Sequence, residues 1–108
     1  MHALRYDLLL KGGHLVDATA GIDGQRDIAF HNGRVAAVEE NLPREAARNV
    51  VDVSESYVAP GLVDMHVHAF IHAYDVGLQL DEICAPSGVT TVCDGGSVGA
   101  VNFRGMNE

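Results

Sequence analysis

The sequence predicts a small β-sandwich followed by a β–α–β unit. Short strand-prone runs separated by turn residues fill residues 1–57, and several such strands at regular spacing are typical of a small sandwich. Residues 58–108 instead hold two strand-like runs on either side of a longer connection, and a Gly-rich loop follows the second run. The pattern changes at Pro60-Gly61, so we expect two domains, 1–57 and 58–108.

The first strands flank a pair of glycines. Residues 6–11 and 14–17 are strand-prone, and Gly12-Gly13 between them predicts a turn. The small and turn-forming residues over 18–24 predict a loop. The chain should therefore reverse direction once at the glycines before it enters this loop.

The clearest local signal is Asn32-Gly33, which separates strand-like runs at 27–31 and 34–38. Asn and Gly both tolerate positive φ, which a two-residue hairpin turn requires at its two central positions. The polar segment 39–48 then predicts a loop or a single helical turn. Further short strands are expected at 49–53 and 57–59.

Segment 62–68 predicts a strand with two different faces. Asp64, His66 and His68 stand at alternate positions and therefore project to one face, together with Leu62. The residues between them are apolar and form the opposite face. The segment thus combines a polar row with a face suited to packing.

The two histidines are candidate metal ligands. At a rise of roughly 3.3 Å per residue they stand about 6.6 Å apart along the strand, so both imidazoles can converge on one ion. Neutral imidazole binds Zn²⁺ and related ions. Asp64 could orient one of the metal ligands by a hydrogen bond, without binding the metal itself. The alternative is that His66 and His68 form only an exposed polar edge.

The rest of the second half predicts a connection and a second strand. Residues 75–85 are the helix candidate, although Gly77 weakens it. Residues 89–93 are apolar and β-branched, which is typical of a strand buried on both faces of a parallel sheet. A polar, Gly-rich loop over 94–97 follows at the carboxyl end of that strand.

Composition narrows the classes of partner. Asp and Glu number 15 against 7 Lys and Arg, for a formal net charge of -8, which disfavours nucleic acid and anionic membrane surfaces. No signal peptide or bilayer-spanning run is apparent, so we expect a cytoplasmic protein. Cys84 and Cys93 are expected to be reduced and buried as small apolar residues.

These features resemble those of a known family over essentially the whole chain. Residues 60–68, Pro-Gly-Leu-Val-Asp-Met-His-Val-His, match every fixed position of a signature of the amidohydrolase superfamily, which includes dihydroorotases, hydantoinases and many deacetylases. Segments 6–17 and 27–35 are similar to the family's opening strands. Segment 87–97 resembles the second barrel strand of the dihydroorotase-like branch, and 99–105 resembles a deacetylase-type subgroup.

The resemblance implies a β-sandwich joined to a (β/α)₈ barrel of TIM type, of which this chain would hold the first βαβ part. It implies one or two divalent metals, zinc by default with manganese or cobalt as alternatives, bound by His66 and His68 from the first barrel strand. The implied reaction is hydrolysis of a carbon–nitrogen bond by metal-activated hydroxide. The substrate would be a small-molecule amide, cyclic amide or N-acyl compound, and the full-length enzyme a homo-oligomer.

The chain departs from the family pattern in length. A bridging carboxylate, two further histidines and a late aspartate are expected on later barrel strands, and this sequence ends after the second one. We therefore expect a fragment of a longer hydrolase, or a truncated reading frame, that is inactive alone. Two alternatives stay open: a stand-alone metal-binding module, and a non-catalytic relative with a structural role.

Other polar residues could support the site. Asp94 could contact substrate or orient a metal ligand, or it could only cap its turn. The N–H groups of 95–97, with the Ser97 side chain, could bind an anionic group. Asn102 and Arg104 could bind a substrate carboxylate.

The remaining histidines are expected to have no role in the site. His72 lies four residues after His68 and could line the barrel mouth, but a surface position is the stronger expectation. Three others are expected on the sandwich surface: His2, His14 and His31.

Overall fold

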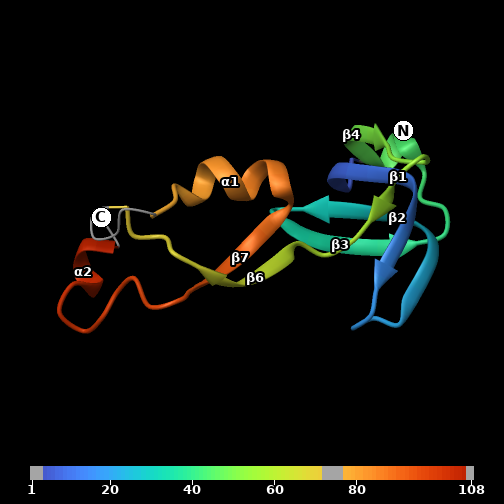
Figure 1. The fold of residues 1–108 in the computed structure, drawn as a ribbon. Helices are drawn as coiled ribbons and strands as arrows, with labels where there is room; N and C mark the ends of the chain where they lie inside the picture. The colour runs from blue at the N-terminus through green and yellow to red at the C-terminus, as the bar shows by residue number, and fades with distance from the viewer. Residues whose placement is uncertain (1–3, 72–76, 107–108) are drawn as a thin grey trace. The chain divides into compact units, whose positions relative to one another are not determined.

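A computed structural model describes residues 4–71 and 77–106 of the chain (Figure 1). Its contacts divide the chain into two compact units, Met1–Pro60 and Gly61–Glu108. Each unit is described by itself below.

The first unit is one mixed five-stranded sheet. Its strands are ordered β3-β2-β1-β4, and β5 also pairs with β1. Strand β2 is antiparallel to both of its neighbours, β1 and β3. Strands β4 and β5 run parallel to β1. The bounds are β1 Tyr6–Asp17, β2 Ile22–His31, β3 Arg34–Glu39, β4 Ala47–Asp52 and β5 Tyr57–Val58.

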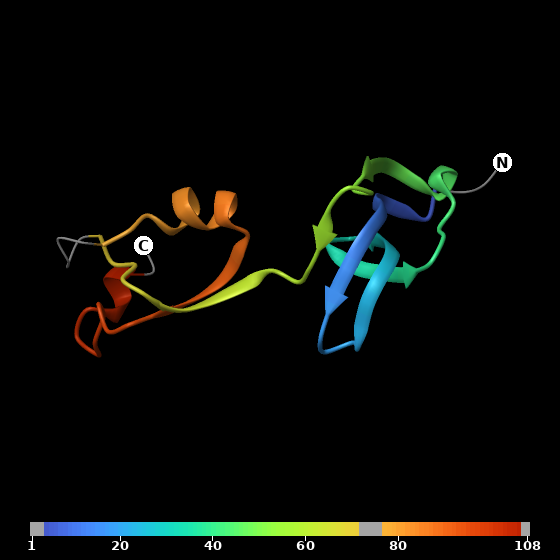
Figure 2. The same cartoon turned by 45° about the vertical axis from the view of Figure 1, so that its right-hand side comes forward.

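The sandwich expected from the sequence is therefore seen as a single sheet in the described residues. The physical reason is the length of β1, whose 12 residues pair with β2 along one side and with β4 and then β5 along the other (Figure 2). One long strand thus organises every other strand of the unit.

The turn predicted at Gly12-Gly13 was wrong, because β1 continues through both glycines. The register with β2 shifts between Leu10 and Gly13, which marks a bulge. Gly12 has φ +81°, and a Cβ on Gly13 would lie 2.8–2.9 Å from side-chain carbons of Val53 and Val58. Glycine is needed here for a bulge and a close approach, and the chain reverses only after Asp17.

The hairpin predicted at Asn32-Gly33 is confirmed. Asn32 has φ 51° and Gly33 φ 72°, and the turn joins β2 to β3. Strand β2 begins at Ile22, so the loop predicted over 18–24 is shorter than expected. The predicted loop or helical turn over 39–48 contains one 3₁₀ turn, Arg44–Ala46.

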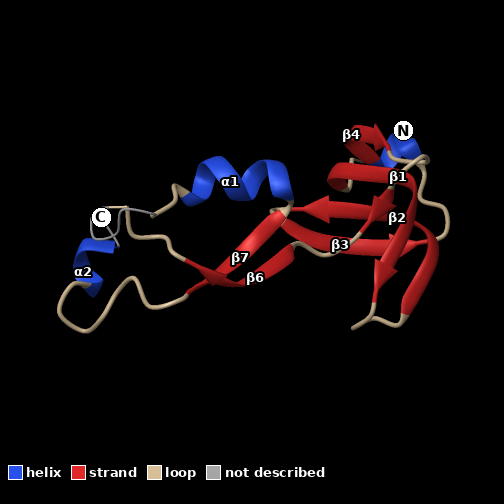
Figure 3. Ribbon diagram, viewed as in Figure 1, coloured by secondary structure: helices blue, strands red, loops and turns tan. Residues whose placement is uncertain are grey.

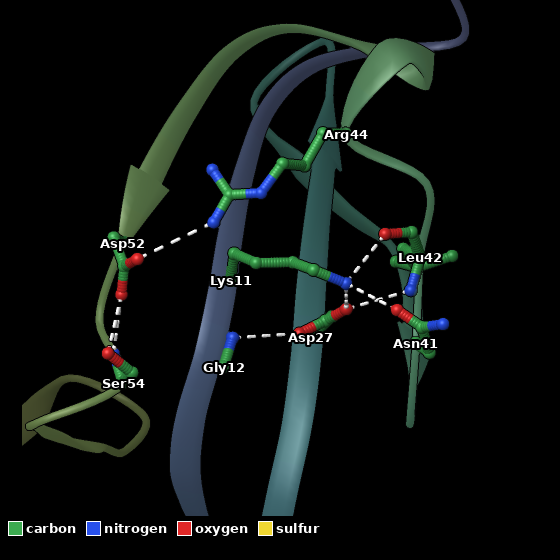
Figure 4. A network of polar contacts seen from close by, with 8 residues as sticks. All are labelled: Lys11, Gly12, Asp27, Asn41, Leu42, Arg44, Asp52 and Ser54. Carbon is green, nitrogen blue, oxygen red and sulfur yellow. Dashed lines mark hydrogen bonds and ion pairs between the residues drawn. The ribbon is translucent and has the colours of Figure 1, made fainter.

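The core of this unit combines apolar packing with one buried ion pair. The buried apolar cluster comprises Leu9, Ala29, Leu42 and Ala47. Beside it, the buried carboxylate of Asp27 accepts hydrogen bonds from Lys11 Nζ at 2.5 Å, Gly12 N at 2.8 Å and Leu42 N at 2.7 Å (Figure 4).

This network lowers the pKa of Asp27. Burial alone would raise the pKa of this carboxyl, but the hydrogen bond from Lys11, the N–H groups of Leu42 and Gly12, and the positive charge of Lys11 outweigh it. Lys11 also donates to Asn41 Oδ1 and to the Leu42 carbonyl. The pair therefore ties β1, β2 and the segment after β3 together.

The second unit contains the predicted β–α–β arrangement. Strands β6 (Leu62–Val67) and β7 (Val89–Asp94) are parallel, and α1 (Leu80–Ser87) connects them (Figure 3). A short helix, α2 (Phe103–Met106), follows and was not predicted. The helix candidate at 75–85 is displaced: α1 starts at Leu80, and residues 75–76 lie outside the described residues.

Helix α1 ends as its sequence directs. Gly88 follows it with φ 74°, the left-handed conformation that favours glycine at this position. The next residue begins β7, and Leu62 N donates to the Gly88 carbonyl at 2.9 Å. The start of β6 is thereby held against the end of α1.

Much of the β6–β7 pair is exposed, contrary to expectation. On β6 only Val67 is buried, while Val63 is 62% and Met65 80% exposed. Strand β7 has only partly buried and exposed residues, because its only strand partner in the described part of the chain is β6. The prediction that this strand is buried on both faces was therefore wrong for this chain.

The cysteines are unbridged, as expected, but they are not buried. Cys84 is half-buried on α1 and Cys93 is exposed on β7. Among the residues that the structure describes, no helix has the length and apolar character needed to cross a membrane.

Candidate functional site

The candidate site lies at the carboxyl end of β6. His66 is on this strand, and His68 is the first residue after the strand ends at Val67. Their ring centroids are 5.2 Å apart with the ring planes at 69°. The chain therefore places both imidazoles side by side, close enough to share a ligand.

Gly95 packs against both of these rings. Its N–H donates to the Val67 carbonyl at 2.6 Å, which joins the loop after β7 to the end of β6. A Cβ at this position would lie 2.5 Å from His66 Nε2 and 3.3 Å from His68 Cε1. Such a clash shows that the imidazoles pack directly on the glycine backbone, and sequence analysis missed this role.

Asp94 organises the same loop through its carboxylate. Oδ2 accepts from Ala69 N at 3.0 Å, and Oδ1 accepts from Gly96 N at 2.9 Å and Ser97 N at 2.6 Å. These bonds, the one from Ala69 foremost, lower the pKa of Asp94 to about 2 despite the opposing effect of burial. The carboxylate is thus ionised at neutral pH and links the segments that follow β6 and β7.

Ser97 connects this carboxylate to a histidine. Its side chain is buried, with 7% of the residue exposed, and its Oγ lies 3.0 Å from His68 Nδ1. The N–H groups over 95–97, which the sequence offered as an anion site, already donate to Val67 and Asp94.

Two of the other sequence candidates have local partners, and the third is exposed. Asp64 Oδ1 accepts from His66 N at 3.0 Å, so this carboxylate binds the backbone of the strand. Asn102 Oδ1 accepts from Gly99 N at 2.7 Å within its own turn, and Arg104 is exposed on α2.

The remaining histidines divide as follows. His14 and His31 are exposed in the first unit, as expected, and lie 2.6 Å and 3.4 Å from carboxylate oxygens of Asp23 and Asp7. His2 and His72 lie outside the described residues.

The two imidazoles suit a divalent ion by their chemistry. Nitrogen donors of this kind are common ligands of zinc. The Nδ1 atom of His68 lies 3.0 Å from a hydroxyl, and a hydrogen bond at one ring nitrogen is what orients a ligating histidine. Within residues 4–71 and 77–106, no group of three or more His, Cys, Asp or Glu side chains could hold a metal. His66 and His68 therefore fit as part of a site that needs further ligands.

Comparison with known proteins places the chain in a family. It is 37% identical to a dihydroorotase of Trichlorobacter lovleyi over 94 residues, covering 81% of this chain and 21% of that protein. It is 38% identical to a deacetylase of Agrobacterium fabrum over 77 residues, covering 71% and 19%. The chain thus spans about a fifth of the length of these curated relatives. No family model matches it.

Solved structures agree with these relatives. An adenine deaminase is similar with a TM-score of 0.77 and 33% identity over 94% of this chain and 26% of its own. A dihydroorotase gives 0.72 and 32% over 94% and 27%. An N-acyl-D-glutamate deacylase from Bordetella bronchiseptica, solved with zinc and a phosphonate inhibitor, gives 0.66 and 30% over 82% and 18%.

The chain belongs to the amidohydrolase superfamily, and its relatives include both dihydroorotases and deacetylases. Its mixed sheet and β–α–β unit match the N-terminal region of these enzymes.

Proposed function

We propose that His66 and His68 are ligands of a divalent metal, zinc in the first instance, in a hydrolase that acts on carbon–nitrogen bonds. The observation that supports this most is the pairing of the two imidazoles at the carboxyl end of β6 in a chain of this superfamily. The zinc-containing deacylase among the similar structures supports the choice of metal.

Each residue of the site would have a separate task. A divalent ion supplies Lewis acidity, which activates water and polarises a carbonyl. His66 and His68 would bind it, and Gly95 leaves room for both rings on the loop after β7. The hydrogen bonds of Asp94 hold that loop to the segment after β6, so Gly95 keeps its position against the two rings.

This segment would supply only part of the active centre. Two imidazoles cannot complete a tetrahedral site, and the curated relatives are about five times longer than this chain. We infer that β6 and β7 are the first strands of a (β/α)₈ barrel, and that further ligands and the group that transfers the proton stand on later strands. The substrate would be an N-acyl compound or a cyclic amide, the classes that the relatives' names indicate.

The test is the double variant His66→Ala with His68→Ala in this chain. Zn²⁺ affinity, measured by competition with a chromophoric chelator, should fall by more than the roughly 10–100-fold caused by losing a supporting residue. The matched control is His14→Ala with His31→Ala, which removes two exposed imidazoles from the first unit. Equal Zn²⁺ binding by both double variants would contradict the assignment.

The enzymatic part of the proposal needs the longest natural polypeptide that contains this segment. There the double variant should reduce hydrolysis of N-acyl amino acids or dihydroorotate to background, while the control variant retains it. A longer polypeptide that binds zinc through the pair and hydrolyses neither class would instead support a metal-binding role without catalysis.

A further inference from the structure

We propose that Asp64 is a positioning residue of the histidine pair, because its carboxylate holds a β-bulge that directs the His66 ring towards His68. The use of the pair, binding a divalent metal, rests on the proposed function. The arrangement of the two rings is a property of this chain and can be measured without any metal.

The bulge lies near the carboxyl end of β6. Between two paired positions, β6 holds two residues, Met65 and His66, where β7 holds only Cys93. Two residues opposite one define a β-bulge, which bends its strand, increases the local twist and re-aims the side chains around it. The flanking pairs are Asp64 with Val92 and Val67 with Asp94.

A second bulge shows that the change in alignment is local. At the start of the strand pair β7 has the extra residue, Thr90, between the partners of Leu62 and Val63. Gly61 leaves room for it, since a Cβ on Gly61 would overlap the Thr90 side chain. The two strands therefore have the same alignment at both ends of the pair and are shifted by one residue only between the two bulges.

The bulge on β6 decides which residue of the following loop meets the rings. With the bulge, the last pair of the ladder is Val67 with Asp94, and Gly95 comes next. Without it, the alignment of the preceding pairs would continue and place Gly95 itself opposite Val67. A shift of one residue moves each side chain to the other face of a strand. The close packing of Gly95 on both imidazoles therefore depends on the bulge.

Asp64 supplies the acceptor that the bulge needs. The extra residue of a bulge is left unpaired in the ladder, so its N–H needs another partner. Asp64 Oδ1 accepts from His66 N, two positions along the chain, at 3.0 Å. The carboxylate thus takes the place of a carbonyl group of the neighbouring strand.

The backbone after His66 is held differently, by other segments of the unit. Three of its groups are hydrogen bonded: the Val67 carbonyl by Gly95 N at 2.6 Å, the His68 carbonyl by Leu78 N at 2.9 Å, and Ala69 N by Asp94 Oδ2 at 3.0 Å. The backbone at His68 is therefore fixed by distant partners, whereas the bulge at His66 is fixed from within β6. Loss of Asp64 should displace His66 and leave the backbone at His68 in place.

The experiment compares Asp64→Ala with Asp64→Asn in the isotope-labelled 108-residue chain, free of metal. Asn keeps a side-chain oxygen that can accept from His66 N, whereas Ala removes the acceptor. The readout is the nuclear Overhauser effect between ring protons of His66 and His68, whose ring centroids are 5.2 Å apart. We expect this signal in the wild-type chain and in Asp64→Asn, and its loss in Asp64→Ala.

The matched control is Asp52→Ala. Asp52 Oδ1 also accepts the N–H two positions along the chain, that of Ser54, at 3.0 Å, but in the first unit (Figure 4). This variant should leave the contact between the histidine rings unchanged. In each sample, cross-strand signals between Val67 and Asp94 report that β6 and β7 are still paired.

Three results would overturn the inference. The first is a wild-type chain in which Val67 pairs with Gly95, because β6 then has no bulge. This measurement needs no variant, so it holds even if Asp64→Ala fails to fold. The second is an unchanged ring contact in folded Asp64→Ala. The third is loss of the ring contact in Asp64→Asn, because the charge of Asp64 rather than its oxygen acceptor would then be responsible.

A Zn²⁺ titration separates this inference from the proposed function. Loss of the supporting carboxylate in Asp64→Ala should weaken binding about 10–100-fold. If the His66 and His68 double variant leaves Zn²⁺ binding unchanged, the metal assignment fails while the result on the ring contact stands. If Asp64→Ala leaves the ring contact unchanged, the inference fails while the metal assignment can stand.

Discussion

At the scale of single residues, the site depends on a glycine as much as on its histidines. The imidazoles of His66 and His68 lie against Gly95, where any side chain would occupy the position of a ring. Sequence reasoning placed the histidines on one face of a strand, and the structure brings their rings together. Nothing in the sequence distinguishes Gly95 from Gly96, the glycine that follows it.

A methyl group at this position should disturb the histidine pair. We expect Gly95→Ala to displace the His66 ring, because the new Cβ would lie 2.5 Å from its Nε2. Zn²⁺ affinity should fall by about 10–100-fold, as for loss of other supporting groups. Gly99→Ala is the control, since its Cβ would meet no atom closer than 4.0 Å. Equal zinc affinity in the two variants would refute the close packing.

Asp27 offers a residue-scale prediction about stability. Asp27→Asn leaves Lys11 without its ionic partner in a largely buried position, so the free energy of unfolding should fall by about 3 kcal/mol in urea titrations. The control is Asp23→Asn, whose carboxylate is 79% exposed beside His14 and should contribute less than about 1 kcal/mol.

The same carboxylate predicts a pH dependence. The pKa of Asp27 is lower in the folded chain than its ordinary value of 3.8, so the unfolded chain binds the proton more readily. This contribution to stability is complete above 3.8 and is lost as the pH falls through the lower folded pKa. Urea unfolding monitored by circular dichroism between pH 7 and 3 should show a smaller acid loss in Asp27→Asn than in the wild type. An identical acid dependence would contradict this account.

At the scale of elements, local turn chemistry was the most predictable feature. Asn32-Gly33 specifies its hairpin because both positions need positive φ, and the structure has φ 51° and 72° there. Gly12-Gly13 was misread because the same residue type serves a bulge as well as a turn. The difference is decided by Asp27, whose carboxylate binds Gly12 N across the strand pair.

The hairpin gives a prediction at this scale. We expect Gly33→Ala to lower the free energy of unfolding by about 1–2 kcal/mol, because an L side chain is strained at φ 72°. Gly24→Ala in β2 is the control, since its φ is not in the left-handed region and a Cβ there would meet only the end of the flexible Arg26 side chain at 4.0 Å. Chemical denaturation compares the two, and a larger loss in Gly24→Ala would refute the argument.

At the scale of the whole chain, the second unit leaves several large apolar side chains uncovered. Val63, Met65, Val101 and Phe103 are all more than 60% exposed. Strands β6 and β7 pair only with each other in the described part of the chain. Exposed apolar strands with unpaired outer edges favour association with other chains.

This surface predicts concentration-dependent association of the 108-residue chain. Val63→Thr with Met65→Gln should reduce the associated fraction in sedimentation velocity runs, because both side chains are exposed on β6. The comparison variant is Val16→Thr with Val51→Thr, which alters less exposed apolar residues of the first unit. If the β6 substitutions leave the associated fraction unchanged, the chains associate through another surface and this prediction is wrong.

The sequence by itself determined what depends on neighbours along the chain. Alternation placed His66 beside His68, the Asn32-Gly33 pair set a hairpin, and the signature at 60–68 identified the superfamily. Each of these follows from strand geometry, from backbone preference, or from the residues of a short contiguous motif.

Only the tertiary structure decided what depends on residues that are distant in sequence. The ionised carboxylate of Asp94 reaches Ala69, 25 positions away, and Ser97 reaches His68 across 29. These contacts form because β6 and β7 run parallel and bring the loops at their carboxyl ends to the same edge. No pattern along the chain encodes which of several loop residues then meets which histidine, since that choice is made by hydrogen bonds between segments brought together by folding.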